Sequence, residues 1–373
     1  MAAARAVVGW YGDPTVSWSV LLQARLATPA QASAVAERLG RLVTRYPHLG
    51  AAPVVLESTA AEWPVAHAAF ADEPYLDGEP LVRAAVATDD GLLLVAAHHG
   101  ATDGLGLLAV LAAALGTDLV SQARGIADRP ATAPFLASAA RRLAEALFAP
   151  PARIAPSAGA KAARSTGPVM ADAGVADAGA GGAGRGDVLV AVELPATSAG
   201  SAAVTAATAR AAQEWNARHG TPFRRAVAGL GVSRRDGVHA SPVPDSAFLR
   251  LRLPRPAGDD ADDAAVRRLI AGQAPEPAFP RSRSAAPAAV TRILASRLGS
   301  TFLASNLGVV RGDPGVRSLA FYPSASGRSG VAVGAATIAA TTTITLRARR
   351  SAFDHPAAAD LLSMIVTHLA PPR

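Results

Sequence analysis

The most constraining feature of this sequence is a continuous apolar run that leads into two adjacent histidines. Residues Gly91–Ala97 carry no polar side chain, so the segment suits a strand in a buried position. The polar turn His98-His99-Gly100-Ala101-Thr102-Asp103-Gly104 follows, and then a helix opens that carries Leu105, Leu108, Leu111 and Leu115 on one side. A buried strand, a short polar turn and an apolar helix in direct succession predict an α/β arrangement.

The segments before this run support the same arrangement. Strands are predicted over Val16–Leu26 and Leu81–Thr88, and the pair Asp90-Gly91 predicts a hairpin into the apolar run. A helix is predicted to begin at Thr28-Pro29, with Thr28 as the cap and Gln31 completing a capping box. Its apolar stripe comprises Val35, Leu39, Leu42, Val43 and Tyr46, and Pro47 ends it.

A stretch rich in Ala, Gly, Pro and Ser divides the chain. Residues 150–186 have almost no periodicity and are predicted to be a flexible linker between an N-terminal lobe, 1–149, and a C-terminal lobe, 187–373. In the second lobe helices are predicted near 198–218, 260–272, 286–298 and 356–369. Strands are predicted near 188–194, 226–233, 247–253, 301–305, 318–321, 331–337 and 341–348. The prediction is a two-lobed α/β protein with mixed sheets flanked by helices.

Composition excludes several classes of function. The 373 residues include no cysteine, which removes disulfides, thiolate nucleophiles and sulfur-ligated metals and fits a reducing cytoplasm. The longest apolar stretch, Gly104–Gly116, is too short to cross a bilayer, and no signal-peptide core is visible. The net charge is +7, but the arginines are scattered and aromatic residues are only 5%, which argues against a nucleic-acid binder. A mildly positive surface favours an anionic small molecule or an acidic carrier protein.

The turn from His98 to Gly104 is the place where chemistry could reside. Adjacent strand residues point to opposite faces, so one histidine can face a cavity while the other turns into the core. Asp103 needs a cation or several N–H donors if it is buried, and Gly104 permits a close backbone approach. The competing interpretation from the residues alone is a pair of hydrogen-bonded core histidines. Neighbouring strand residues cannot both reach one metal ion, and no second cluster of ligands accompanies them.

A dinucleotide fingerprint is a further alternative, because Gly104, Gly106 and Ala109 satisfy G-x-G-x-x-A between a strand and a helix. It fails on context, since no strand ending in an acidic residue follows at the required distance. A G-x-S-x-G nucleophile elbow is absent from the sequence.

The turn resembles the HHxxxDG motif of the chloramphenicol-acetyltransferase-like superfamily. This superfamily includes condensation domains of peptide synthetases, plant-type acyltransferases, wax ester synthases and polyketide-associated acyltransferases. Three further segments resemble its motifs in the same order, namely Arg45-Tyr46-Pro47-His48-Leu49, Gly231-Val232-Ser233-Arg234-Arg235 and Ser305-Asn306-Leu307-Gly308. The D-F-G-W-G motif of the plant-type branch is missing, and Phe321-Tyr322-Pro323-Ser324 stands near its place, which argues against that branch.

The resemblance implies two lobes that meet along a tunnel and an acyltransferase that uses a thioester on coenzyme A or an acyl carrier protein. His99 is implied to be the general base toward a hydroxyl or amine acceptor, in secondary or lipid metabolism, with no other cofactor and no metal. Asp103 is implied to pair with Arg235, although Arg234 is an equal candidate by position. His98 and Gly104 are implied to support the turn, and Ser305 and Asn306 to line the tunnel. The alternative is a non-catalytic member of the fold that binds a carrier protein or a pathway enzyme.

Overall fold

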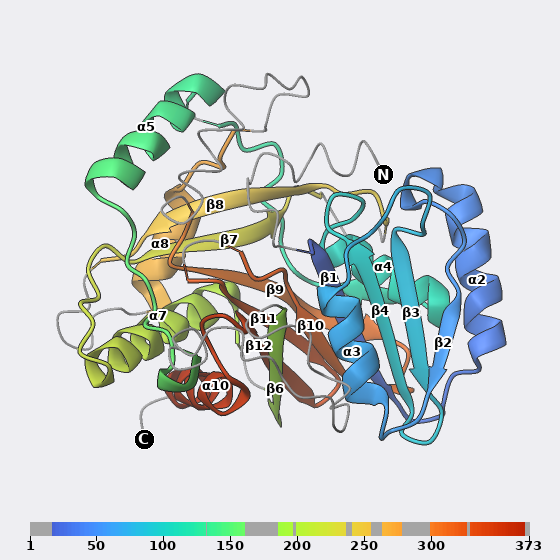
Figure 1. Ribbon diagram of the computed structural model, residues 1–373. Helices are drawn as coiled ribbons and strands as arrows, with labels where there is room; N and C mark the ends of the chain where they lie inside the picture. Colours follow the sequence, from blue (N-terminus) through green and yellow to red (C-terminus); the bar gives the residue numbers. More distant parts are fainter. Residues whose placement is uncertain are drawn as a thin grey trace.

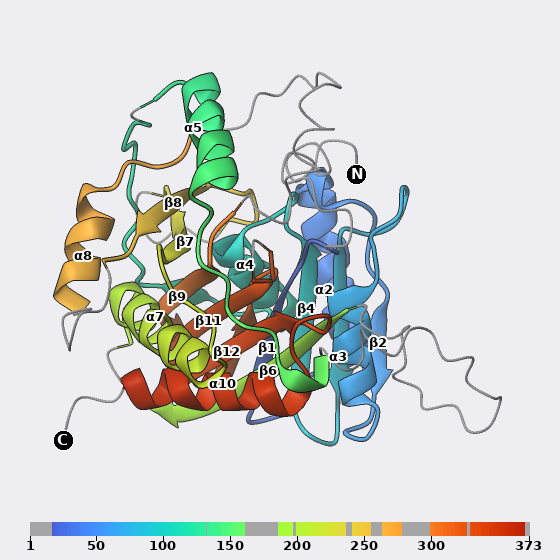
Figure 2. The same ribbon diagram turned by 60° about the vertical axis from the view of Figure 1, so that its left-hand side comes forward.

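The computed structural model describes residues 17–131, 133–160, 186–196, 199–235, 241–254, 263–277, 299–326 and 329–369. Two mixed β-sheets flanked by helices make up the protein, as the sequence predicts (Figures 1 and 2). The predicted helix near 286–298 lies outside the described residues.

The first sheet has five strands in the order β10-β1-β4-β3-β2. These strands are β1 (Ser19–Leu26), β2 (Val55–Ser58), β3 (Val82–Ala87), β4 (Leu92–His98) and β10 (Val316–Tyr322). The hairpin predicted at Asp90-Gly91 is confirmed, because β3 and β4 pair antiparallel with Ala87 opposite Leu92. Gly91 adopts a φ of 61°, a conformation that glycine reaches at little cost.

Helices cover both faces of this sheet, which explains why β4 has no polar face. The helices are α2 (Ala32–Arg45), α3 (Trp63–Asp72) and α4 (Gly104–Leu115), and a 3₁₀ turn, η2 (Pro47–Leu49), follows α2. Leu22 and Val95 pack with α2 and α4 in one core. Leu21 and Leu94 pack with α3 in another core on the opposite face. Strand residues therefore alternate between two apolar environments, and every residue of β4 is buried.

The predicted start of α2 is wrong by several residues. The helix begins at Ala32 with Gln31 as its N-cap residue, and no side chain caps it. The N–H of Ala27 donates instead to the carbonyl of Gly315 in the turn before β10, which extends the contact of β1 with β10 beyond Leu26. This sheet contact outweighs the local capping signal at Thr28. The predicted buried stripe is confirmed at Val35, Leu39 and Val43.

The second sheet follows the order β6-β12-β11-β9-β7-β8, and β5 pairs with β9. Its strands are β5 (Leu119–Ser121), β6 (Asp187–Pro195), β7 (Val227–Ser233), β8 (Ser246–Arg252), β9 (Phe302–Gly312), β11 (Val331–Ile338) and β12 (Thr341–Arg349). The remaining helices are α5 (Phe135–Phe148), α7 (Ser201–Arg218), α8 (Asp263–Gly272) and α10 (His355–Leu369). In both views α7 and α10 lie side by side against this sheet (Figures 1 and 2).

The two halves of the chain are interlocked. β10 comes from the second half but completes the first sheet beside β1, and β5 comes from the first half but pairs with β9 in the second sheet. Residues 150–160 of the predicted linker are packed onto the second half, where Ile154 and Ala155 are buried in its core. Residues 161–185 lie outside the described residues. Each half therefore contributes structure to the other.

Candidate functional site

The two histidines occupy different environments at the end of β4. His98 is the last residue of the strand and is buried, with 4% of its surface exposed. Its Nδ1 accepts a hydrogen bond from the Gly100 N–H at 3.1 Å, and its ring meets Tyr75 edge to face at 5.4 Å between centroids. The structure therefore places His98 in the core, as a support for the turn, and leaves His99 as the more accessible ring.

His99 is held by backbone groups on two sides. Its N–H donates to the Trp18 carbonyl at 2.7 Å, which continues the pairing of β4 with the beginning of β1. Its Nδ1 lies 3.3 Å from the Thr102 carbonyl oxygen. A carbonyl only accepts hydrogen bonds, so Nδ1 carries the proton and Nε2 keeps a free lone pair. The turn thus selects the tautomer of the imidazole.

The surroundings of His99 also favour its neutral form. Burial lowers the pKa of His99 below the usual 6.5, while the Thr102 carbonyl and the charge of Asp103 oppose this shift in part. Desolvation disfavours a charged imidazolium, so the ring is neutral near pH 7. A neutral imidazole with an unprotonated Nε2 is the form that accepts a proton from another molecule.

Asp103 joins the turn to the second half of the chain. Its Oδ1 accepts from the Arg235 guanidinium at 3.0 Å and from the Gly106 N–H at 2.8 Å, and its Oδ2 accepts from the Asp245 N–H at 2.7 Å. The carboxylate also serves as the N-cap of α4. Arg235, and not Arg234, is therefore the arginine that pairs with Asp103. The Asp103 side chain is 5% exposed and the Arg235 side chain 11%, so the two form a buried ion pair.

The second half of the chain contacts the turn through a segment that sequence reasoning missed. Arg235 donates its other terminal nitrogen to the carbonyls of Ser241 and Val243, and the fully buried Thr102 hydroxyl donates to the Pro242 carbonyl at 2.8 Å. A Cβ on Gly106 would lie only 2.1 Å from the Thr102 hydroxyl oxygen. Close packing accounts for Gly106, which had also suggested a dinucleotide fingerprint.

Gly104 lies close to one strand of each sheet, β10 of the first and β9 of the second. A Cβ at this position would meet Phe321 at 2.9 Å and Leu307 at 3.2 Å. The close approach predicted for Gly104 is thus an approach of α4 to β9 and β10. No signal in the sequence specified these partners, because packing across the two sheets depends on their relative placement.

Ser305 and Asn306 lie on β9, and the amide of Asn306 is engaged within the protein. Its Nδ2 donates to the Ala199 carbonyl at 2.7 Å, and its Oδ1 accepts from the Gly308 N–H at 2.7 Å. Gly308 has a φ of 72°, which fits the irregular pairing of β9 with β11 at this point. Asn306 therefore shapes the strand beside the turn, while contact of either side chain with a substrate stays a prediction.

The described residues contain neither a metal-binding cluster nor a membrane-spanning helix. No group of three or more His, Asp or Glu side chains there is arranged to hold a metal ion. None of the helices in these parts of the chain combines the length and apolar character needed to cross a membrane.

Comparisons with known proteins give the fold but no close relative. No family model matches the chain, and no curated protein matches it. The starter condensation domain of rhizomide synthetase, solved as a double mutant with C8-CoA and Leu-SNAC, aligns with 99% of this chain and 93% of its own at 14% identity and a TM-score of 0.55. A single mutant of that domain with C8-CoA aligns over 99% and 94%, at 14% identity and a TM-score of 0.55.

A second protein supports the same conclusion. A structure describing condensation-domain-mediated chain release from the enacyloxin polyketide synthase aligns with 100% of this chain and 83% of its own, at 18% identity and a TM-score of 0.51. The chain therefore has the fold of these condensation domains.

Proposed function

We propose that this protein is an acyltransferase that moves an acyl group from a thioester to a hydroxyl or amine acceptor. The observation that carries the proposal is His99, whose Nδ1 faces the Thr102 carbonyl and whose Nε2 is left as the basic nitrogen. The fold adds support, because a condensation domain that shares it was solved with C8-CoA and Leu-SNAC. Acyl transfer in peptide, polyketide or related secondary metabolism fits both observations.

The proposed reaction follows from this tautomer. Nε2 of His99 removes the proton from the acceptor while the acceptor oxygen or nitrogen bonds to the thioester carbonyl carbon. The carbon–sulfur bond then breaks, and the imidazolium returns its proton to the departing thiolate. An ester or amide and a free thiol result, and the imidazole is neutral again. The thioester is a co-substrate, carried by coenzyme A or by a carrier protein, and the step needs no metal.

Asp103 has a different part in this proposal. Three donors, from Gly106, Arg235 and Asp245, already engage its two oxygens, which supports a structural role for this carboxylate and not a contact with substrate. Its carboxylate instead fixes the end of the turn that supplies the Thr102 carbonyl to His99. We propose that the channel for the two substrates passes between the lobes at His99.

Incubation of the protein with a panel of acyl thioesters tests the function. The panel combines C2 to C16 acyl-CoAs and the corresponding N-acetylcysteamine thioesters with amino acids, amines and alcohols, and products are identified by mass spectrometry. We expect a product whose mass is that of the acceptor plus the acyl group, together with one equivalent of thiol. A protein that binds thioesters in the same panel without turnover would instead be a non-catalytic member of the fold.

The lowered pKa of His99 predicts the pH dependence of the reaction. The base is active when neutral, so activity falls as the pH drops through the pKa of His99 and is retained above it. Because burial lowers this pKa, the acidic limb of kcat/KM should have its midpoint below 6.5. Circular dichroism at each pH separates titration from unfolding. A midpoint at or above 6.5 in folded protein would contradict the environment assigned to His99.

A further inference from the structure

The backbone that holds His99 is strained at its other end. The Trp18 carbonyl that accepts from the His99 N–H belongs to a residue with a φ of 57°. A bulky L-residue adopts this left-handed conformation only where its surroundings enforce it, and such outliers gather at functional sites. The groups that fix residues 17–19 therefore also fix the backbone of His99.

Arg347 on β12 is the group that encloses this strained residue from both sides. Its Nη1 donates to the Ser19 carbonyl at 2.6 Å, and its Nη2 reaches the Ser17 hydroxyl at 3.4 Å and the Ala71 carbonyl at 2.9 Å. The Ser17 hydroxyl also donates to the Ala71 carbonyl and accepts from the Ser19 N–H. One guanidinium thus contacts the residues immediately before and after Trp18.

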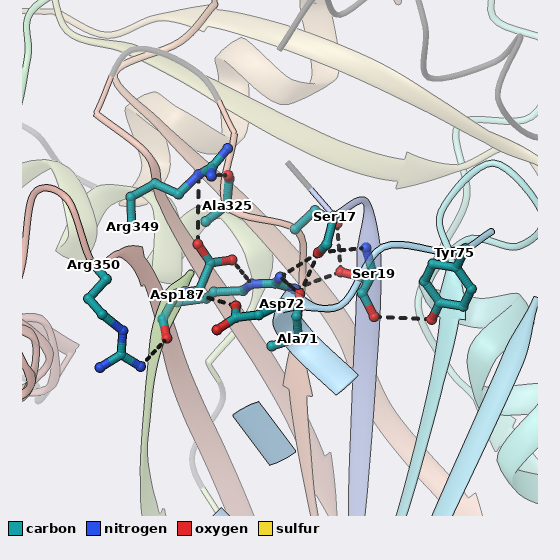
Figure 3. A network of polar contacts seen from close by, with 11 residues as sticks. Ser17, Ser19, Ala71, Asp72, Tyr75, Asp187, Ala325, Arg349 and Arg350 are labelled. Carbon is teal, nitrogen blue, oxygen red and sulfur yellow. Dashed lines mark hydrogen bonds and ion pairs between the residues drawn. The ribbon is translucent and has the colours of Figure 1, made fainter. Parts of the chain in front are cut away.

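Asp187 orients this guanidinium. Its Oδ2 accepts from the Arg347 Nε at 2.6 Å, and the Arg347 side chain is completely buried. Asp187 is fixed in turn, since its N–H donates to Asp72 at 2.9 Å and its carbonyl accepts from Arg350 at 3.1 Å. Figure 3 shows these contacts, which connect β6 and β12 of the second sheet with β1 and α3 of the first.

The same network touches His98. Ser19 lies opposite His98 in the β1–β4 ladder, and its hydroxyl lies 3.2 Å from the Tyr75 hydroxyl, whose ring meets His98 edge to face. The Ser19 carbonyl accepts a second hydrogen bond from the buried Ser324 hydroxyl at 2.8 Å. Both histidines of the turn are therefore braced through residues 18 and 19.

We infer that Arg347 is a positioning residue that places the His99 backbone from the second sheet, through the enforced conformation of Trp18. It acts through the Trp18 carbonyl and does not touch the reacting atoms. Its geometric role is independent of the activity, whereas its effect on acyl transfer rests on the proposed function. Arg347 and the Asp103–Arg235 pair then fix the turn at opposite ends, and each connects it to the second half of the chain.

Hydrogen exchange of the His99 amide tests the inference directly. The variant Arg347→Met keeps an unbranched side chain about as long as the aliphatic part of arginine but removes all the donors, and the matched control is Arg250→Met. Arg250 also forms a buried ion pair, at 2.7 Å to Glu145. Its guanidinium donates to Glu145 and to the Gly299 carbonyl, and neither partner lies on β1 or in the histidine turn. We expect exchange of the amides of Ser19 and His99, read by fragmentation mass spectrometry, to become at least tenfold faster in Arg347→Met and to stay unchanged in Arg250→Met.

Two results would overturn the inference. One is native-like protection at residues 19 and 99 in folded Arg347→Met, and the other is an equal acceleration in Arg250→Met, which would indicate general loosening. If Arg347→Met does not fold, the comparison passes to Arg347→Lys and Arg250→Lys. A single ammonium replaces three nitrogens that face different acceptors, so accelerated exchange is expected again in Arg347→Lys alone.

Kinetics then separate this inference from the proposed function. In the acyl-transfer assay, Arg347→Lys should lower kcat at least tenfold and leave KM within about threefold, because the base is displaced while substrate contacts stay. If the wild-type protein shows no transfer activity, the proposed function is refuted. The hydrogen-exchange result would still test whether Arg347 positions the His99 backbone. Unchanged kcat together with faster exchange would refute a role of Arg347 in the reaction.

Discussion

Replacing His99 by alanine is expected to lower acyl transfer by about 10²–10⁴-fold and to leave the protein folded. The ring supplies the only proton acceptor that the proposed reaction uses, so no other group replaces it. Its loss removes one long hydrogen bond, at 3.3 Å to Thr102, from a partly exposed side chain. The free energy of unfolding should therefore change by only about 1 kcal/mol. The rate is measured as kcat/KM and the stability by calorimetry.

The exposed His48 provides the matched control. It lies in the 3₁₀ turn after α2, and His48→Ala should retain wild-type activity and melting temperature. His98→Ala is unsuitable for this purpose, because it leaves the Gly100 N–H without its acceptor inside the core. Undiminished transfer by His99→Ala, in protein shown to be folded, would remove His99 from the mechanism.

The sequence predicted the elements that rely on local patterns. The β3–β4 hairpin, the buried β4 and the stripe of α2 follow from periodicity and from Asp90-Gly91, and the structure confirms them. The same local patterns locate the polar turn, because two adjacent histidines directly follow the apolar run of β4. The partner of Asp103 came from the resemblance of Gly231–Arg235 to a family motif, and the structure decided between the two adjacent arginines.

What the sequence did not predict depends on contacts between distant segments. The exchange of β5 and β10 between the sheets leaves no trace in hydrophobic periodicity, which gives a strand's faces but not its neighbours. Arg347 looks like any other arginine in the alternating pattern of β12, although its side chain is completely buried. The left-handed conformation of Trp18 is likewise imposed by tertiary contacts, against the preference of the residue.

Replacing Asp103 by alanine is expected to destabilise the protein by about 3–5 kcal/mol, much more than His99→Ala does. The change leaves the Arg235 guanidinium buried without its carboxylate and removes the acceptor of the Gly106 and Asp245 N–H groups. Urea unfolding measures the difference. The matched control is Glu37→Ala, because Glu37 pairs with Arg41 on the exposed surface of α2 and its removal should cost only about 0–1 kcal/mol.

A double-mutant cycle separates the ion pair from the hydrogen bonds that Asp103 also accepts. Arg235→Met alone leaves the Asp103 carboxylate buried with two N–H donors, so it should also destabilise the protein. In the double variant no unpaired charge stays buried, and the total loss should be smaller than the sum of the two single losses. Additive losses would mean that the contact at 3.0 Å contributes no coupling. A lower stability of His99→Ala than of Asp103→Ala would reverse the roles assigned to the two residues. The turn would then be held by its imidazole, and not by the carboxylate that joins it to the second half of the chain.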